Sequence, residues 1–184
     1  MKILFCGGGT AGHISPAIAM AEMLSDSRYR CECAFVGRSG GEENLTIVNE
    51  GYKLYTIEIE GIARKLSGGA IKSCIKAIRS LKEAEAIIDE FKPDLIIGTG
   101  GYVCWPVIKV GIKKKIKTAI HESNAEPGLA TRLLAPRCDA VLINLKVIGY
   151  LSCTRNLNAV YINVCFNFFR ARRIIHRVNV RECI

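Results

Sequence analysis

Short apolar runs alternate with stretches of helical length along most of this chain of 184 residues. The apolar runs predict β-strands over Lys2–Cys6, Cys33–Gly37, Lys53–Ile59, Asp94–Gly100, Lys117–His121 and Ala140–Asn144. The connecting stretches predict helices over Ser15–Leu24, Glu42–Asn49 and Ser67–Phe91. Strands joined by helix-length connections form parallel sheets, because a parallel pair needs a crossover. We therefore predict an α/β fold with helices on both faces of a parallel sheet.

The last part of the chain lacks this alternation of strands, turns and helices. From about Arg155 it contains neither glycine nor proline, and it has very few acidic residues to balance its arginines. We expect at most a strand over Ala159–Val164 and a helix over Phe168–Val178 there. The chain is therefore divided into a domain over 1–155 and a divergent tail over 156–184.

Composition narrows the class of protein. Hydrophobic residues make up 49% of the chain, which suits a folded core, and no apolar run is long enough to span a bilayer. The apolar start "MKILFC" is too short for a signal peptide, so we expect a protein that stays in the cytoplasm. Its nine cysteines are scattered and odd in number, which favours buried reduced thiols over disulfides or metal ligands.

The formal net charge of +9 favours an anionic partner, such as nucleic acid, an acidic membrane surface or a phosphorylated substrate. No helix-turn-helix, zinc spacing or basic-aromatic strand motif supports nucleic acid. On the helix Ser67–Phe91, cationic residues recur beside an apolar stripe. We expect this face to dock on an acidic membrane surface through Lys72, Lys76, Arg79 and Lys82, together with the Lys113–Lys115 cluster.

The stretch "GGGTAGHISPA" follows the first strand directly and begins at Gly7. Glycines at a strand-to-helix junction let an anion approach free backbone N–H groups at the positive end of the helix. Pro16 suits a first helical turn with Ser15 as N-cap, which would leave His13 at the mouth of the turn. A merely tight turn is the alternative without a ligand.

Gly7, Gly9 and Gly12 also match the dinucleotide pattern G-x-G-x-x-G. A NAD site typically has an acidic side chain at the end of the second strand, which binds the ribose 2′-hydroxyl. This chain has Arg38 there. An arginine suits a 2′-phosphate, so an NADP-dependent oxidoreductase stays open as an alternative.

Two further stretches fall at the same predicted edge of the sheet. "GTGGYVCWP" (Gly98–Pro106) is a second glycine cluster with Tyr102 in it, and "HESNAEPGLATRLLA" (His121–Ala135) places several polar residues after another strand. Large polar side chains directly after an apolar strand are poor core material, so we expect those from His121 onward to line a cleft.

These three motifs, in this order, closely resemble the N-terminal domain of the MurG family of peptidoglycan N-acetylglucosaminyltransferases, over about Met1–Thr154. The resemblance implies a GT-B fold, in which two Rossmann-like domains face each other across a cleft. It implies that N-acetylglucosamine passes from UDP-N-acetylglucosamine to the 4-hydroxyl of a lipid-linked N-acetylmuramoyl-pentapeptide, with inversion. It also implies a peripheral enzyme at the cytoplasmic face of the membrane.

The resemblance assigns roles to residues. His13 would be the general base and Glu122 would orient or assist it. Donor contacts would come from Thr10, Ala11, Gly12 and Asn124. The acceptor diphosphate would lie on Gly7, Gly8, Gly9, Gly100, Gly101 and Tyr102. No cofactor or metal is implied, and the chain has no Asp-x-Asp pair that would hold a divalent ion.

The chain also departs from the family. It lacks the second, donor-binding domain, and the turn that leads to that domain reads Ile162-Asn163-Val164-Cys165-Phe166 here, without the family's arginine. We expect a truncated or frameshifted chain that binds acceptor but does not transfer sugar alone. A free-standing acceptor-binding subunit, with the donor domain on a separate partner chain, stays open as an alternative.

Overall fold

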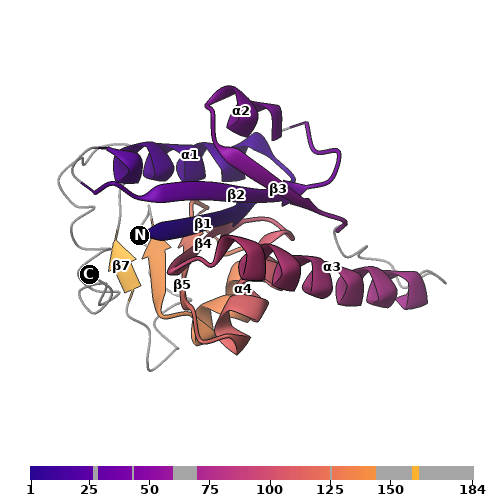
Figure 1. Cartoon of the computed structure of the whole chain (residues 1–184). Helices are drawn as coiled ribbons and strands as arrows, with labels where there is room; N and C mark the ends of the chain where they lie inside the picture. The colour runs from indigo at the N-terminus through magenta and orange to yellow at the C-terminus, as the bar shows by residue number, and fades with distance from the viewer. Residues whose placement is uncertain (27–28, 43, 60–69, 125, 144–158, 162–184) are drawn as a thin grey trace.

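The computed structural model describes residues 1–26, 29–42, 44–59, 70–124, 126–143 and 159–161. The strands among them form one parallel sheet in the order β3-β2-β1-β4-β5-β6-β7 (Figure 1). These strands are β1 (Lys2–Gly7), β2 (Glu32–Arg38), β3 (Lys53–Ile57), β4 (Leu95–Gly100), β5 (Lys117–Glu122), β6 (Ala140–Ile143) and β7 (Ala159–Tyr161). The helices are α1 (Ala11–Ser25), α2 (Asn44–Asn49), α3 (Ala70–Phe91), α4 (Cys104–Lys113) and α5 (Leu129–Leu134), with the 3₁₀ turn η1 (Ala135–Arg137).

The direction in which the sheet grows reverses once. The chain builds β1, β2 and β3 outward in one direction, then returns through α3 and adds β4 on the other side of β1. Open α/β sheets bind ligands at such a reversal, in the crevice outside the carboxyl ends of the two strands, which are β1 and β4 here. The predicted α/β fold is therefore confirmed, and both predicted glycine turns lie at this crevice.

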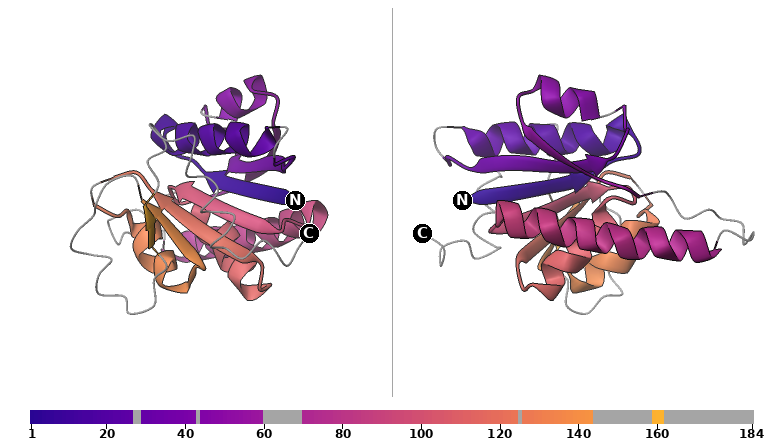
Figure 2. Two further views of the ribbon diagram at one scale, coloured as in Figure 1. Left: turned by 90° about the vertical axis from the view of Figure 1, so that its left-hand side faces the viewer. Right: turned by 45° about the vertical axis from the view of Figure 1, so that its right-hand side comes forward.

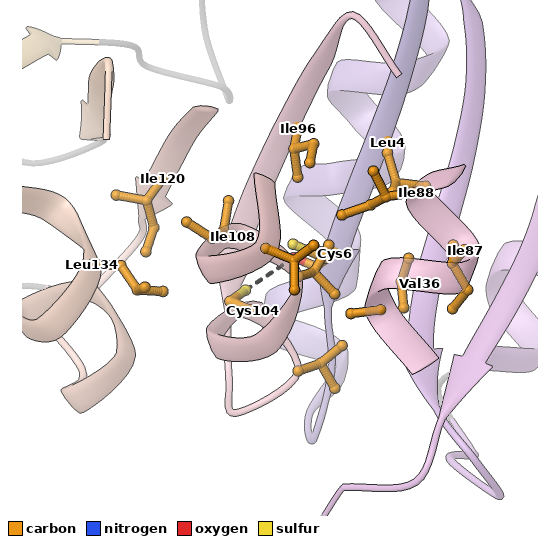
Figure 3. Packing of buried hydrophobic residues seen from close by; sticks show 14 of the residues in the cluster. Leu4, Cys6, Val36, Ile87, Ile88, Ile96, Cys104, Ile108, Ile120 and Leu134 are labelled. Carbon is orange, nitrogen blue, oxygen red and sulfur yellow. Dashed lines mark hydrogen bonds between the residues drawn. The ribbon is translucent and has the colours of Figure 1, made fainter. Parts of the chain in front are cut away.

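Helices cover both faces of the sheet (Figure 2), and each face has its own hydrophobic core. Ile3 and Phe5 of β1 pack toward α1, whereas Leu4 and Cys6 pack toward α3 and α4. Successive side chains of a strand point to opposite faces, so a continuous apolar run fills two cores at once. Figure 3 shows the second core, in which Cys104 of α4 lies against Cys6.

Helix α1 begins four residues earlier than predicted. Thr10 is its N-cap and Pro16 lies inside the helix, so the expected N-cap at Ser15 is wrong. Pro16 has no N–H to donate to the carbonyl of Gly12, so this intrahelical hydrogen bond is missing. The consequence is functional, because His13 belongs to the first turn of a helix instead of a loop.

Helices α4 and α5 were not predicted, because glycine and proline obscure their sequence pattern. Pro106 lies in the first turn of α4, where a proline costs little, and Gly111 packs against Ile96. A Cβ on Gly111 would come 2.6 Å from the Ile96 side chain, so close contact between α4 and β4 requires the glycine.

Three further expectations concern the cysteines, the tail and membrane-spanning helices. Cys31 and Cys33 of the β2 region pack into the same core, and both are free thiols, in line with the expected reduced cysteines. In the tail, β7 confirms part of the predicted strand and pairs with β6. The predicted helix Phe168–Val178 lies outside the described residues. Among the described residues, no helix is both long and apolar enough to cross a membrane.

Candidate functional site

The first glycine turn leaves the start of α1 uncapped by a side chain. Thr10 takes an extended backbone, as an N-cap does, but its hydroxyl makes no cap hydrogen bond in the described structure. It lies instead 3.2 Å from Nδ1 of His13. The first N–H groups of a helix have no intrahelical acceptor, so this end can receive an anion. Gly9, Thr10 and Gly12 are exposed there.

The second glycine turn packs directly on the first. Gly100 and Gly101 have positive φ values of 119° and 78°. A Cβ on Gly101 would collide with the carbonyl oxygen of Gly8, and one on Gly100 would lie 2.5 Å from the His13 ring. These two glycines therefore let the turns and the imidazole pack together.

Because the two turns pack on each other, only some of their glycines are exposed to a ligand. Gly7, Gly8 and Gly100 are buried, so their backbone lies inside the contact between the turns. The N–H of Gly100 is already donated to Sγ of Cys104, at 3.1 Å. Gly101 and Tyr102, which precede α4 in the second turn, are partly exposed, and the Tyr102 ring lies over Gly9. Ligand binding by all six predicted diphosphate residues stays a prediction.

Cys104 ties the second turn to β1. Its Sγ lies 3.0 Å from the carbonyl oxygen of Cys6 and 3.0 Å from that of Gly100. The register between β1 and β4 also shifts at this point: Cys6 pairs with Gly98, whereas Gly7 pairs with Gly100. The extra residue of this bulge, Thr99, donates its hydroxyl to Cys6. Sequence reasoning missed Cys104, since an apolar-looking cysteine after a glycine turn gives no signal of this contact.

His13 is half-buried and its ring is held in one orientation. Nδ1 lies 3.2 Å from the carbonyl oxygen of Gly8. A carbonyl can only accept a hydrogen bond, so in the neutral ring this contact favours the proton on Nδ1. The lone pair then belongs to Nε2, the nitrogen that lies beside Gly100. The ring is thus arranged to accept a proton at Nε2.

Glu122, the other predicted catalytic residue, ends β5 and is only 4% exposed. Both of its oxygens are used within its own loop. Oε1 accepts from the backbone N–H and the side-chain amide of Asn124, at 2.9 and 2.8 Å. Oε2 accepts from the N–H of Gly128 at 3.0 Å and from the hydroxyl of Thr131 at 2.7 Å.

Burial alone would raise the pKa of Glu122, but the hydrogen bonds from Thr131, Asn124 and Gly128 outweigh burial and hold that pKa below its usual value. The carboxylate therefore stays ionised. The expectation that the polar run from His121 lines a cleft is wrong for its first two residues, because both are buried in β5. Asn124 is exposed, and its amide is oriented by Glu122. Glu122 thus orients Asn124, and its predicted role toward His13 stays a prediction.

The predicted cationic face is smaller than expected. Arg79 pairs with Glu58 and Glu83. In the Lys113–Lys115 cluster, Lys113 pairs with Glu85, and Lys114 pairs with Glu85 and Asp89. Lys76 and Lys82 are exposed, whereas only the backbone of Lys72 is described. Ile78, an apolar residue between Lys76 and Lys82 in the sequence, is 59% exposed.

The model of the glycosyltransferase family 28 N-terminal domain matches residues 3–143. The chain belongs to glycosyltransferase family 28. The match includes both glycine turns and the whole Glu122 loop. Membership in this family does not favour the alternative of an NADP-dependent oxidoreductase.

Curated relatives of this family 28 chain include transferases from Caldanaerobacter subterraneus and Thermoanaerobacter sp., 45% and 47% identical over 146 residues. Each is named a UDP-N-acetylglucosamine–N-acetylmuramyl-(pentapeptide) pyrophosphoryl-undecaprenol N-acetylglucosamine transferase. These matches cover 79% of this chain but only 40% of each relative. A relative from Carboxydothermus hydrogenoformans is 39% identical over 169 residues, 92% of the chain, so this match reaches into the segment 156–184.

Solved structures agree on the fold. MurG from Acinetobacter baumannii superimposes on this family 28 chain with a TM-score of 0.72 at 24% identity, covering 88% of this chain and 44% of that one. The UDP-GlcNAc 2-epimerase of Methanocaldococcus jannaschii does so with a TM-score of 0.67 at 14% identity, covering 88% and 45%. This likeness confirms the predicted fold of one GT-B-type domain.

Proposed function

We propose that this chain is the acceptor-binding part of an N-acetylglucosaminyltransferase that uses UDP-N-acetylglucosamine and an undecaprenyl diphosphate-linked N-acetylmuramoyl-pentapeptide. The observation that carries the proposal is the start of α1, which no side chain caps and which is exposed at Gly9 and Gly12. The imidazole of His13 lies beside it, with Nε2 able to accept a proton. The names of the curated relatives supply the substrates.

We assign diphosphate binding, proton transfer and donor contact to different residues of the site. The N-terminal amides of α1, together with Gly101 and Tyr102, bind the acceptor diphosphate and offset its charge through the positive end of the helix. His13 takes the proton of the acceptor 4-hydroxyl at Nε2 as this oxygen attacks the anomeric carbon of the donor. UDP leaves from the opposite side, so the configuration inverts. Glu122 holds Asn124, which contacts the donor together with Thr10, Ala11 and Gly12.

The first experiment titrates the chain with a short-prenyl diphospho-N-acetylmuramoyl-pentapeptide and, separately, with UDP-N-acetylglucosamine. Binding of the first without the second supports an acceptor-binding part. Absence of acceptor binding contradicts the proposal, and so does transfer of radiolabelled sugar by this chain alone. The transfer assay is then repeated with a donor-binding domain supplied from a related transferase, in the same protein or as a separate chain.

His13→Ala, made in that two-domain version, is expected to lower turnover by about 100-fold or more, the usual contribution of a positioned base. Melting curves should stay close to those of the parent, because the ring is half-buried at the surface. The pH profile of the transfer is the second readout. Turnover equal to that of the parent removes His13 from the mechanism.

A membrane surface completes the proposal. The N-terminal end of α3 extends beyond the sheet (Figures 1 and 2). Along this helix the side chains of Lys76, Ile78 and Lys82 are exposed. An acidic leaflet attracts each such cation by about 1 kcal/mol, and an apolar side chain adds to the contact. The peripheral position is at the cytoplasmic face, where the nucleotide sugar is found.

Flotation with vesicles of phosphatidylglycerol tests this surface. Ile78→Ser and Lys82→Gln should each reduce the bound fraction, whereas Lys92→Gln, at an exposed position beyond the other end of α3, should not. Equal loss in Lys82→Gln and Lys92→Gln would show a general charge effect, and it would remove α3 as the docking element.

A further inference from the structure

Arg38 ends β2 at the same edge of the sheet as the glycine turns, and the transfer proposed above gives it no role. Cys6 of β1 pairs with Val36 of β2 in parallel register, so continuing that register places Arg38 level with Gly8. Neighbouring strands lie about 4.8 Å apart. Arg38 thus lies two residues beyond the last printed β1–β2 pair, on the strand next to the first glycine turn.

The side chain of Arg38 points to the face of the sheet that carries α3 and α4. A Cβ on the preceding residue, Gly37, would collide with Asn44 of α2, on the other face. Successive residues alternate, so Arg38 shares its face with Val36 and with its neighbour on β3, Ile57, both of which belong to the second core. Tyr102 packs on this same core and lies over Gly9. Arg38 and Tyr102 thus flank the first glycine turn on one face.

The charge of Arg38 is not matched within the described structure. Its Nε is buried without a hydrogen-bond partner, and no described carboxylate forms an ion pair with its guanidinium. Arg79 and Lys114, by contrast, each pair with two carboxylates. A partly buried cation without a counter-ion is unfavourable, because it loses hydration and gains nothing in return.

We propose that Arg38 binds an oxyanion of the acceptor, either a phosphate of the diphosphate or a carboxylate of the peptide. A guanidinium offers two parallel N–H donors, which match the two oxygens of either group. This inference rests on the proposed function, since it takes the glycine turns as the place where the acceptor lies. It adds a residue that selects for an anionic acceptor at the β2 side of the crevice.

The test compares Arg38→Met with Arg137→Met by calorimetric titration of the whole chain. Arg137 is an exposed arginine of η1, which leads into the amino end of β6 and therefore lies at the opposite edge of the sheet. The probes are geranyl diphosphate, a short-prenyl diphospho-N-acetylmuramoyl-pentapeptide, and the same molecule with its peptide carboxylates amidated. Arg38→Met should weaken binding about tenfold, the loss of one charge-assisted contact, while Arg137→Met binds as the parent does.

The probes identify the source of the oxyanion. Equal weakening on all three probes assigns the contact to the diphosphate, and weakening confined to the free-carboxylate probe assigns it to the peptide. Arg38→Lys should recover part of the affinity, because it keeps the charge without the fork of donors. Arg38→Met should melt at the same temperature as the parent or higher, since it removes an unmatched charge.

Two results would overturn the inference. One is parent-like affinity of Arg38→Met for every probe that the parent chain binds. The other is a marked fall in its melting temperature, which would show that the guanidinium serves the fold. Failure of the parent chain to bind any probe is a separate result, because it contradicts the proposed function itself.

Discussion

Two polar regions lie at the same edge of the sheet and use their hydrogen-bonding groups in opposite ways. Around Glu122, a buried carboxylate accepts four hydrogen bonds from its own loop. At the first glycine turn, the N-cap hydroxyl of Thr10 turns to His13 and leaves the helix start without a side-chain cap. The polar groups around Glu122 therefore bond with one another, whereas the start of α1 has no side-chain cap, which is the feature on which the proposed ligand site rests.

The difference shows how to separate a scaffold from a binding surface. A buried polar group must find partners inside the protein, so its neighbours are chosen to bond with it. A group that binds a ligand must keep its donors accessible, and the protein tolerates the cost of leaving them unpaired. Both regions look alike in the sequence, because each is a polar stretch after an apolar strand.

The largest effect is expected where the polar groups satisfy each other. Glu122→Ala leaves four donors around an empty buried position and should lower the free energy of unfolding by about 4 kcal/mol. Glu126→Ala, at an exposed position of the same loop, should change it by less than about 0.5 kcal/mol. Urea denaturation of both variants measures the contrast. Similar midpoints would mean that the Glu122 contacts do not stabilise the loop.

The contact between the two glycine turns gives the next largest effect. Gly101→Ala forces a Cβ into the carbonyl of Gly8 at positive φ, and should cost about 3 kcal/mol or more. Gly40 has a similar φ of 69°, but an added Cβ would meet no atom within 4 Å there. Gly40→Ala should therefore cost only about 1 kcal/mol. If thermal melting shows equal losses, backbone strain alone explains both, and the turns need no close contact.

Cys104→Ala is expected to cost about 1–2 kcal/mol, because the N–H of Gly100 then loses its buried partner. Cys104→Ser keeps a donor and an acceptor at that position and should restore most of the stability. Amide hydrogen exchange at Gly100 reports the contact directly. Unchanged protection in the alanine variant would show that Sγ does not hold the turn.

The smallest effect concerns pH. The pKa of Glu122 is lowered in the folded chain, so the stability that its ionised form contributes is present above its ordinary pKa of 4.5. That contribution is lost as the pH falls through the lowered folded value. Glu122→Gln should remove this part of the acid dependence, seen as a flatter loss of stability between neutral and acid pH. An equally steep loss in Glu122→Gln would assign the dependence to other carboxylates.

Sequence patterns were sufficient for the strands and for the edge at which the site lies, because both depend on local periodicity and glycine turns. They failed at Pro16, which was placed at a helix start although it lies within α1. They also failed at Glu122, where four donors from the following ten residues make burial of a charge possible. Such partners cannot be recognised from residue type alone.

By itself, the sequence determined the parallel sheet, the two glycine turns at its crevice and the family to which the chain belongs. Only the tertiary structure decided that Gly100 and Gly101 let the His13 ring pack against the turns, and that both oxygens of Glu122 are hydrogen-bonded. It also decided that Nε of Arg38 is buried without a hydrogen-bond partner among the described residues. The physical reason is that periodicity and turn chemistry act between near neighbours in the chain. Whether a polar group is satisfied or left for a ligand depends instead on groups that folding brings together from distant segments.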